Sequence, residues 1–238
     1  MLEDPGRPAA VQRLLQTATD GRGGTPLPWI AAPIRQAERA LDLRCGIGAL
    51  AGELAPGRWL GLDVGPVPPR DGAWLRGTAD AVPLRACAVD AVCLTLLLPL
   101  LENLDAVFAE IRRVLRPGGT LVALVPSATL RSWADLQDVG LLRAARRDGW
   151  PNRSGLDHAS WLLAAADFAV LGDDRGSFQI PVPDAASAAQ VVADLHTAGV
   201  WSPRASPGTR RALTARLAGS AGPGRVVPVP LRRLVARR

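Results

Sequence analysis

The chain has 238 residues, 48% of them hydrophobic and 21% charged, which is the composition of a globular protein and excludes a disordered one. This length suits one large α/β domain better than two independent domains. The net charge is +6, and all 28 basic residues are arginine because the sequence contains no lysine.

The positive charge by itself would be compatible with a nucleic-acid partner. The arginines are scattered along the sequence, however, and no aromatic residues interleave with their pairs as a stacking surface would need. GC-rich coding explains abundant arginine without lysine equally well. The sequence therefore does not favour nucleic-acid binding. RNA methylation is not favoured either, since no appended RNA-binding module is visible.

The expected cellular compartment is inferred from targeting and membrane-spanning patterns, which we do not find in the sequence. The longest apolar run, residues 91–101, is well short of the roughly 20 residues that a membrane span needs. The first residues show no signal-peptide pattern, so we expect a cytoplasmic protein without a membrane contact. No cysteine pair has the spacing of a zinc or redox site, and we predict buried thiols and no metal. The cysteines are Cys45, Cys87 and Cys93.

In chain order, residues 1–37 form an N-terminal cap with a short helix near Val11–Ala18. Short apolar runs then alternate with helical segments, which predicts parallel strands joined by crossover helices. The expected strands are Arg39–Leu43, Trp59–Asp63, Trp74–Gly77, Ala88–Leu96 and Thr120–Val125. Between the last two, Leu104–Leu115 has its apolar residues at helical spacing, and a stop and tight turn follow at 116–119.

The second half of the chain continues the pattern. We expect helical segments and further strands, with no internal repeat and no domain break. The expected helices are Ala128–Arg147, Asp157–Ala166, Ala185–Ala198 and Gly208–Leu217. The expected strands are Phe168–Leu171, which Ser177–Ile180 either extends or accompanies as a separate strand, and Arg225–Val235.

The segment ALDLRCGIGAL, residues 40–50, carries the chemistry. A strand reaches Asp42, and the chain then turns through glycines into an expected helix, so backbone and helix N-terminus can approach a ligand. In a parallel sheet this turn lies at the edge where ligands bind. Asp63 ends the next strand, where a carboxylate can take both ribose hydroxyls of an adenosine.

Four motifs in order resemble those of class I S-adenosylmethionine-dependent methyltransferases of the type 11-like domain. ALDLRCGIG resembles their first motif, GLDVG their second-strand motif, GTADAVPL the segment after the third strand, and EIRRVLRPGGTLVALVP their helix, turn and fifth strand. The resemblance covers about Ala40 to Pro126. A dinucleotide-binding dehydrogenase is the rival interpretation, but it expects glycine where Ala51 stands and gives no account of LRPGG.

The resemblance implies a Rossmann-like, doubly wound, seven-stranded and mostly parallel sheet, with helices on both faces and an antiparallel last strand. It also implies one methyltransferase domain over residues 1–238. Residues 1–37 are its cap, 38–126 its cofactor-binding core, and 127–238 a substrate-side half with a helical insertion and the last strands.

The resemblance also implies S-adenosylmethionine as cofactor and assigns its contacts. Asp42 would hold the ammonium end, Asp63 the ribose and Val64 the adenine face. The turn would bring its backbone close to the cofactor, the segment after the third strand would contact the edge of the adenine, and the end of the fourth strand would contact the methionine part. The residues are Arg44, Cys45, Gly46 and Gly48 in the turn, Thr78, Ala79 and Asp80 in the segment, and Thr95 and Leu96 at the fourth strand.

Three positions depart from the family pattern. Arg44 stands at the first glycine of the turn, where its side chain either pairs with the cofactor carboxylate or blocks the pocket. Thr78 replaces an aspartate, and Pro99-Leu100 stand where many relatives have a histidine pair. A catalytically degenerate protein of this fold, acting as a partner subunit or binding another ligand, is therefore the alternative.

Methyl transfer requires alignment of nucleophile and methyl, and a base only for some acceptors. The candidate bases are His158 and His196, with Glu102 as a weaker one, and a capping or surface role is open for each. The expected acceptor is a small molecule, because tryptophans fall in the regions that would roof the site, although core packing is open for them too. They are Trp133, Trp150, Trp161 and Trp201. The oligomeric state is not readable from the sequence.

Overall fold

The computed structural model describes residues 4–65, 73–127, 138–146 and 149–238. Its strands are β1 Ala40–Leu43, β2 Trp59–Asp63, β3 Ala73–Arg76, β4 Val89–Thr95, β5 Leu115–Pro126, β6 Ala169–Pro181 and β7 Val226–Arg237. Its α-helices are α1 Arg7–Thr17, α2 Pro26–Ala31, α3 Leu104–Val114, α5 Val139–Ala145, α6 Ser154–Asp157, α7 Ala159–Ala165, α8 Ala185–Thr197 and α9 Pro207–Ala218. Short 3₁₀ turns are η1 Ala32–Ile34, η2 Ala51–Glu53 and η3 Leu98–Leu100.

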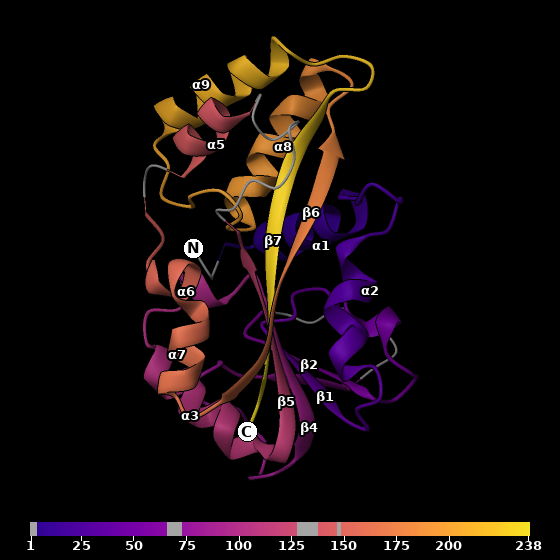
Figure 1. Ribbon diagram of the computed structural model, residues 1–238, viewed down its shortest axis with the longest axis vertical. Coiled ribbons are helices and arrows are strands. Elements are labelled where there is room, and N and C mark those ends of the chain that lie inside the picture. The colour runs from indigo at the N-terminus through magenta and orange to yellow at the C-terminus, as the bar shows by residue number, and fades with distance from the viewer. Residues whose placement is uncertain (1–3, 66–72, 128–137, 147–148) are drawn as a thin grey trace.

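The strands form one seven-stranded sheet in the order β3-β2-β1-β4-β5-β7-β6. The pairs from β3 to β5 are parallel, and β7 runs antiparallel to both β5 and β6 (Figure 1). The expected fold class is confirmed. The strand order reverses between β1 and β4, and ligands of such sheets bind outside the carboxyl ends of the strands at this reversal.

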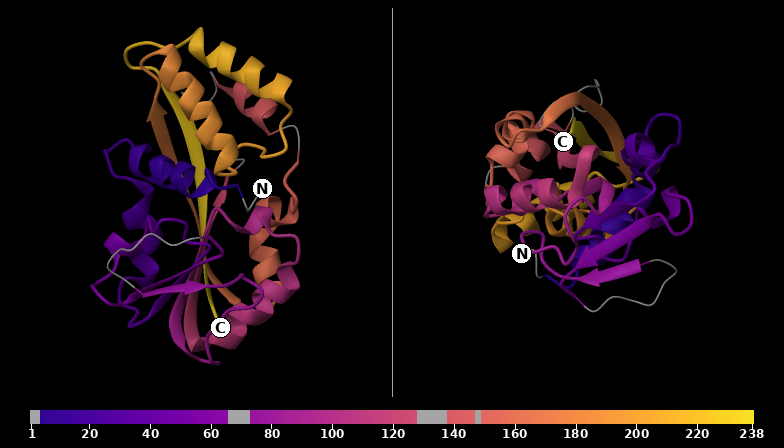
Figure 2. Two further views of the ribbon diagram at one scale, coloured as in Figure 1. Left: turned by 180° about the vertical axis from the view of Figure 1, so that it is seen from behind. Right: turned by 90° about the horizontal axis from the view of Figure 1, so that it is seen from below.

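Helices cover both faces of the sheet (Figure 2). On one face α1, α2 and α8 pack in a core that includes Leu14, Ile30 and Val192, and on the other α3 and α7 pack through Phe108 and Leu163. Side chains alternate along β1, and Leu41 and Leu43 belong to the α3 face, so Asp42 between them points toward α1. None of the described helices is long and apolar enough to cross a membrane.

The predicted helix Leu104–Leu115 is α3. Its buried residues recur every three or four positions, and the Asn103 side chain caps it by accepting a hydrogen bond from the Ala106 amide at 3.1 Å. It ends at Val114 because Leu115 takes an extended conformation and starts β5. This start is earlier than the predicted Thr120, since Leu115 already pairs with Val89, and a register shift follows in the pairing of β4 with β5.

The helix expected after the glycine turn is absent from the described structure, which has only η2 between this turn and β2. The sequence explains this, because Gly52, Pro56 and Gly57 leave too few helix-forming residues in a row. Residues 77–88, between β3 and β4, likewise contain no α-helix. The helix predicted after the glycine turn was therefore wrong, and the connection from β3 to β4 also has no crossover helix.

Other predictions need adjustment in detail. Phe168–Leu171 and Ser177–Ile180 belong to one strand, β6. Of the helical region Ala128–Arg147 the structure describes only α5 and its flanks, and residues 128–137 and 147 lie outside the described residues. Cys87 is exposed, not buried, because it sits at φ +55° in the loop before β4, whereas Cys93 is buried and Cys45 partly so.

Candidate functional site

The turn after β1 is built from three residues in the left-handed region. Arg44, Gly46 and Gly48 have φ values of 57°, 60° and 76°. A Cβ on Gly46 would lie 2.9 Å from Pro8 Cβ of α1, so only glycine fits there. Arg44 holds the same conformation with a side chain, which costs roughly 1 kcal/mol.

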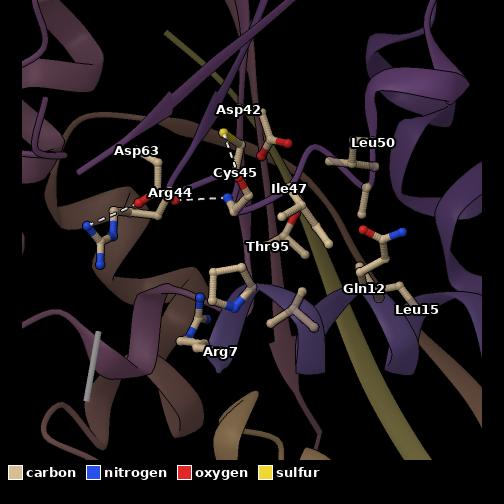
Figure 3. A pocket seen from close by; sticks show the side chains of 14 residues that line it. Arg7, Gln12, Leu15, Asp42, Arg44, Cys45, Ile47, Leu50, Asp63 and Thr95 are labelled. Carbon is tan, nitrogen blue, oxygen red and sulfur yellow. Dashed lines mark hydrogen bonds and ion pairs between the residues drawn. The ribbon is translucent and has the colours of Figure 1, made fainter. Parts of the chain in front are cut away.

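Asp63 ties this turn to the end of β2. Its Oδ2 accepts a hydrogen bond from the Gly46 amide at 2.8 Å, and its Oδ1 accepts one from the Val64 amide at 2.7 Å. The Arg44 Nη1 lies 3.5 Å from Oδ1 as an ion pair (Figure 3). The Arg44 side chain is only 8% exposed, so this pair is shielded from solvent. Asp63 thus sits where the sequence predicted the ribose carboxylate, with Arg44 beside it.

Asp42 lies below the turn as a buried carboxyl. Its Oδ2 accepts a hydrogen bond from Trp59 Nε1 at 3.3 Å, while its Oδ1 has no hydrogen-bond partner among the described residues. Burial raises the pKa of Asp42 to about 7, and the charge of Asp63 adds to the effect. Space for the Trp59 ring comes from Gly61, the β2 residue paired with Asp42, where a Cβ would lie 2.4 Å from the ring.

Helix α1 closes the site from the opposite side. The Arg7 side chain is buried at 5% exposure, and its Nη2 donates a hydrogen bond to the Leu96 carbonyl at 2.8 Å. Burial lowers the pKa of Arg7 to about 10, and the positive charge of Arg44 acts in the same direction. The sequence did not predict that Arg7 and Gln12 of α1 belong to the site. Nothing in their spacing indicates that the N-terminal cap packs against the turn after β1.

Two cavities lie at this edge of the sheet. The inner one, of about 30 Å³, is lined by α1, the turn, Asp42, Asp63 and Thr95. The outer one, of about 490 Å³, is lined by Val64, Thr78 to Asp80, Leu100 to Asn103 and Val107. Arg44 lines both cavities. The structure therefore brings to one or other cavity every residue that the resemblance assigned to the cofactor except Gly48, which packs against the Trp59 ring, and Leu96, whose carbonyl accepts the hydrogen bond from Arg7.

The two histidines are not brought to either cavity. His158 is exposed at the start of α7. His196 is wholly buried on α8, with its Nδ1 2.7 Å from the Ser202 carbonyl oxygen, and burial lowers its pKa. Glu102, in contrast, is exposed and lines the outer cavity. No group of three or more potential metal ligands occurs among the described residues.

The tryptophans expected to roof the site also lie elsewhere where they are described. Trp201 is buried and stacks edge-on against His196, and Trp150 donates a hydrogen bond to the Gly199 carbonyl. Trp161 is 67% exposed on α7. Trp133 is outside the described residues. None of the described three lines either of the two cavities at this edge of the sheet, so they lend no support to an aromatic lid.

Comparison with known proteins agrees with this geometry. The strand order and the site at the strand reversal define a Rossmann-like α/β protein. Residues 41–123, from β1 into β5, match the family model described as a methyltransferase domain. The chain thus resembles class I S-adenosylmethionine-dependent methyltransferases in the sequence of this segment and in its fold. No curated protein sequence matches the chain.

Solved structures share the fold at low sequence identity. A putative methyltransferase from Bacillus halodurans is 15% identical, with 90% of this chain and 99% of that chain covered and a TM-score of 0.57. A putative type II methyltransferase from Anaeromyxobacter dehalogenans is 20% identical, with 89% and 93% covered and a TM-score of 0.56. The cyclase SpnF is also 20% identical, with 88% and 78% covered and a TM-score of 0.52.

Proposed function

We propose that the chain is an S-adenosylmethionine-dependent methyltransferase that acts on a small-molecule acceptor. The observation that carries the proposal is the position of Asp63. Its carboxylate ends β2 on the wall of the inner cavity, beside Val64 and Arg44, which line the outer cavity. Both of its oxygens accept hydrogen bonds from backbone amides of the turns that would surround a nucleoside. A carboxylate so placed takes ribose hydroxyls in proteins of this architecture.

The residues present fit this cofactor in chemistry. The outer cavity has room for an adenine between Val64 and the segment Thr78–Asp80, with Asp63 next to it for the ribose. The unpartnered Oδ1 of the buried Asp42 fits an ammonium group. The inner cavity is too small for the methionine part unless α1 moves away from the turn, because Pro8 packs on Gly46.

The cofactor supplies a methyl group on a sulfonium, which an acceptor displaces in line. The contribution of the chain is to hold the two reactants aligned and to keep water away from them. Asp42, Thr95 and helix α1 line the inner cavity and leave little room for water there. The outer cavity has two carboxylates on its wall, Asp80 and Glu102, and Glu102 is the one that we propose to take a proton from an acceptor; His158 and His196 remain predictions without such a placement.

Calorimetric titration tests the proposal. S-adenosylmethionine and S-adenosylhomocysteine should bind in the micromolar range, and Asp63→Ala should weaken both by about tenfold or more through loss of charged hydrogen bonds. Asp105→Ala, which removes an exposed carboxylate from the first turn of α3, is the matched control and should bind as the wild type does. Absence of binding up to millimolar concentrations would contradict the proposal.

A second candidate is a protein of this fold that binds another ligand and transfers no methyl group. The inner cavity of about 30 Å³ favours it, since α1 occupies the space on the methionine side. A neighbour named as a cyclase has this fold, so the fold does not fix the reaction. Binding of nucleosides without the amino-acid part, together with no affinity for S-adenosylmethionine, would favour this candidate.

A further inference from the structure

Three buried polar atoms that have no hydrogen-bond partner among the described residues belong to residues lining the inner cavity. They are Arg7 Nε and Gln12 Oε1 from α1 and Asp42 Oδ1 from β1. A cavity of about 30 Å³ has room for one or two water molecules. Because an unsatisfied buried polar atom is costly, their convergence indicates that a polar group of a ligand belongs here.

The charges around the cavity favour a negative group next to Arg7. Arg7 and Arg44 are both buried and carry positive charge, and Asp63 is the carboxylate paired with Arg44. Burial raises the pKa of Asp42 to about 7, so near neutral pH this carboxyl is charged in only part of the molecules, and a nearby ammonium would favour its charged form. Among the described residues no carboxylate lies close enough to Arg7 for an ion pair, and the charges of Asp63 and Asp4 act on it only from a greater distance.

The ligand group is defined by the three orphaned atoms together. Arg7 Nε is a donor that suits a carboxylate, while Gln12 Oε1 and Asp42 Oδ1 are acceptors that suit an ammonium. Figure 3 shows Arg7 and Gln12 on the α1 side of the pocket, with Asp42 and Cys45 across from them. An α-amino acid group carries both charges on one carbon.

We propose that Arg7 binds the carboxylate of an amino-acid group in this cavity, and that Gln12 and Asp42 accept hydrogen bonds from its ammonium. If that group is part of the cofactor, the inference rests on the proposed function. The carboxylate contact, for which the sequence had suggested Arg44, is then made by Arg7 of α1. The structure commits Arg44 to Asp63 instead. A carboxylate from a separate small ligand has the same chemistry, and the test distinguishes the two sources.

Entry of the group requires α1 to shift. Pro8 fills the space above Gly46, and the Arg7 guanidinium is held by the Leu96 carbonyl. Farther along the helix, Arg13 makes a two-bond ion pair with Asp194 of α8, with N–O distances of 3.0 and 2.6 Å. The first turn of α1 can therefore move while its later turns stay attached to α8.

The test compares S-adenosylhomocysteine with 5′-methylthioadenosine by calorimetry. Both carry the nucleoside and a thioether, but only the first carries the amino-acid group. The wild type should bind S-adenosylhomocysteine about tenfold tighter or more, and Arg7→Gln should remove this preference without weakening 5′-methylthioadenosine. Arg22→Gln removes the same charge from an exposed side chain in the loop after α1 that lines neither cavity, and it should keep the preference.

Equal affinity of the wild type for both compounds would overturn the inference and leave the nucleoside site intact. An equal loss for both compounds in Arg7→Gln would also overturn it, because Arg7 would then only support the fold. Should Arg7→Gln not fold, Arg7→Lys keeps the charge but loses the guanidinium geometry, and an unchanged preference in that variant counts against the inference.

If neither nucleoside binds the wild type, the proposed function fails and the carboxylate subsite is tested alone. Thermal unfolding is then compared in sodium acetate and in sodium chloride at equal ionic strength. A higher Tm in acetate for the wild type and for Arg22→Gln, but not for Arg7→Gln, would support a carboxylate site for a separate ligand. The same Tm in both salts would overturn it.

Discussion

Replacing Asp42 by asparagine should stabilise the protein at neutral and alkaline pH. The carboxyl is buried, its pKa is about 7 instead of the ordinary 3.8, and the main cause is the loss of solvent around its charged form. Asparagine has nearly the same shape, keeps an oxygen for the Trp59 indole, and never carries charge. The substitution therefore removes an ionisation that the fold opposes.

The sign and size of the effect follow from the two pKa values. Because the folded state keeps the Asp42 proton more tightly, it binds more protons than the unfolded state between about pH 4 and pH 7. The wild-type free energy of unfolding falls as the pH rises through this window and levels off above it. At about 1.4 kcal/mol for each pH unit, the loss reaches about 4 kcal/mol.

Urea unfolding followed by tryptophan fluorescence, from about pH 5 to about pH 9, measures this dependence. The variant should gain on the wild type as the pH rises, with Asp105→Asn parallel to the wild type as the control. Parallel curves for Asp42→Asn and the wild type would refute the reasoning. The same variant should bind S-adenosylmethionine more weakly, since it loses the charge offered to the ammonium, so stability and binding should move in opposite directions.

Two further predictions concern the turn. Gly61→Ala in β2 should lower the free energy of unfolding, measured by urea unfolding, by about 1–3 kcal/mol, because the new Cβ would lie 2.4 Å from the Trp59 ring. Gly52→Ala is the control and should not lower it, because nothing lies within 4 Å of that position. Arg44→Gly places a glycine at a left-handed position and frees the Asp63 carboxylate from its ion pair. Adenosine, measured by calorimetry, should therefore bind this variant on the order of tenfold tighter. Weaker binding would show that Arg44 itself contacts the nucleoside.

The sequence predicted most of the sheet because its strand signals are local. Trp59–Asp63 was predicted with the bounds observed, and α3 within one residue, from apolar runs and helical spacing. The motif order then placed Asp42 and Asp63 at the same edge. These features depend on residues only a few positions apart, so a local sequence pattern can predict them.

The parts that were missed depend on distant contacts or on competing local signals. Arg7 enters the site through the Leu96 carbonyl, 89 positions away, and no spacing rule connects such residues. The helix expected after the turn fails because breakers follow within a few residues of Gly48. His196 was a candidate base by residue type alone, and the Ser202 carbonyl and the Trp201 ring hold it in the core.

The place of β7 in the sheet has a consequence for how the protein is made. Val226–Arg237 follows β5 and β6 in the chain and leaves the ribosome after both, yet it lies between them and pairs with both. Until it arrives, the apolar edge of β5 has no neighbour on that side, and such edges recruit other chains. A nascent chain halted before Val226 should therefore be a target for chaperones or aggregate, and the sheet closes only after synthesis has passed this strand.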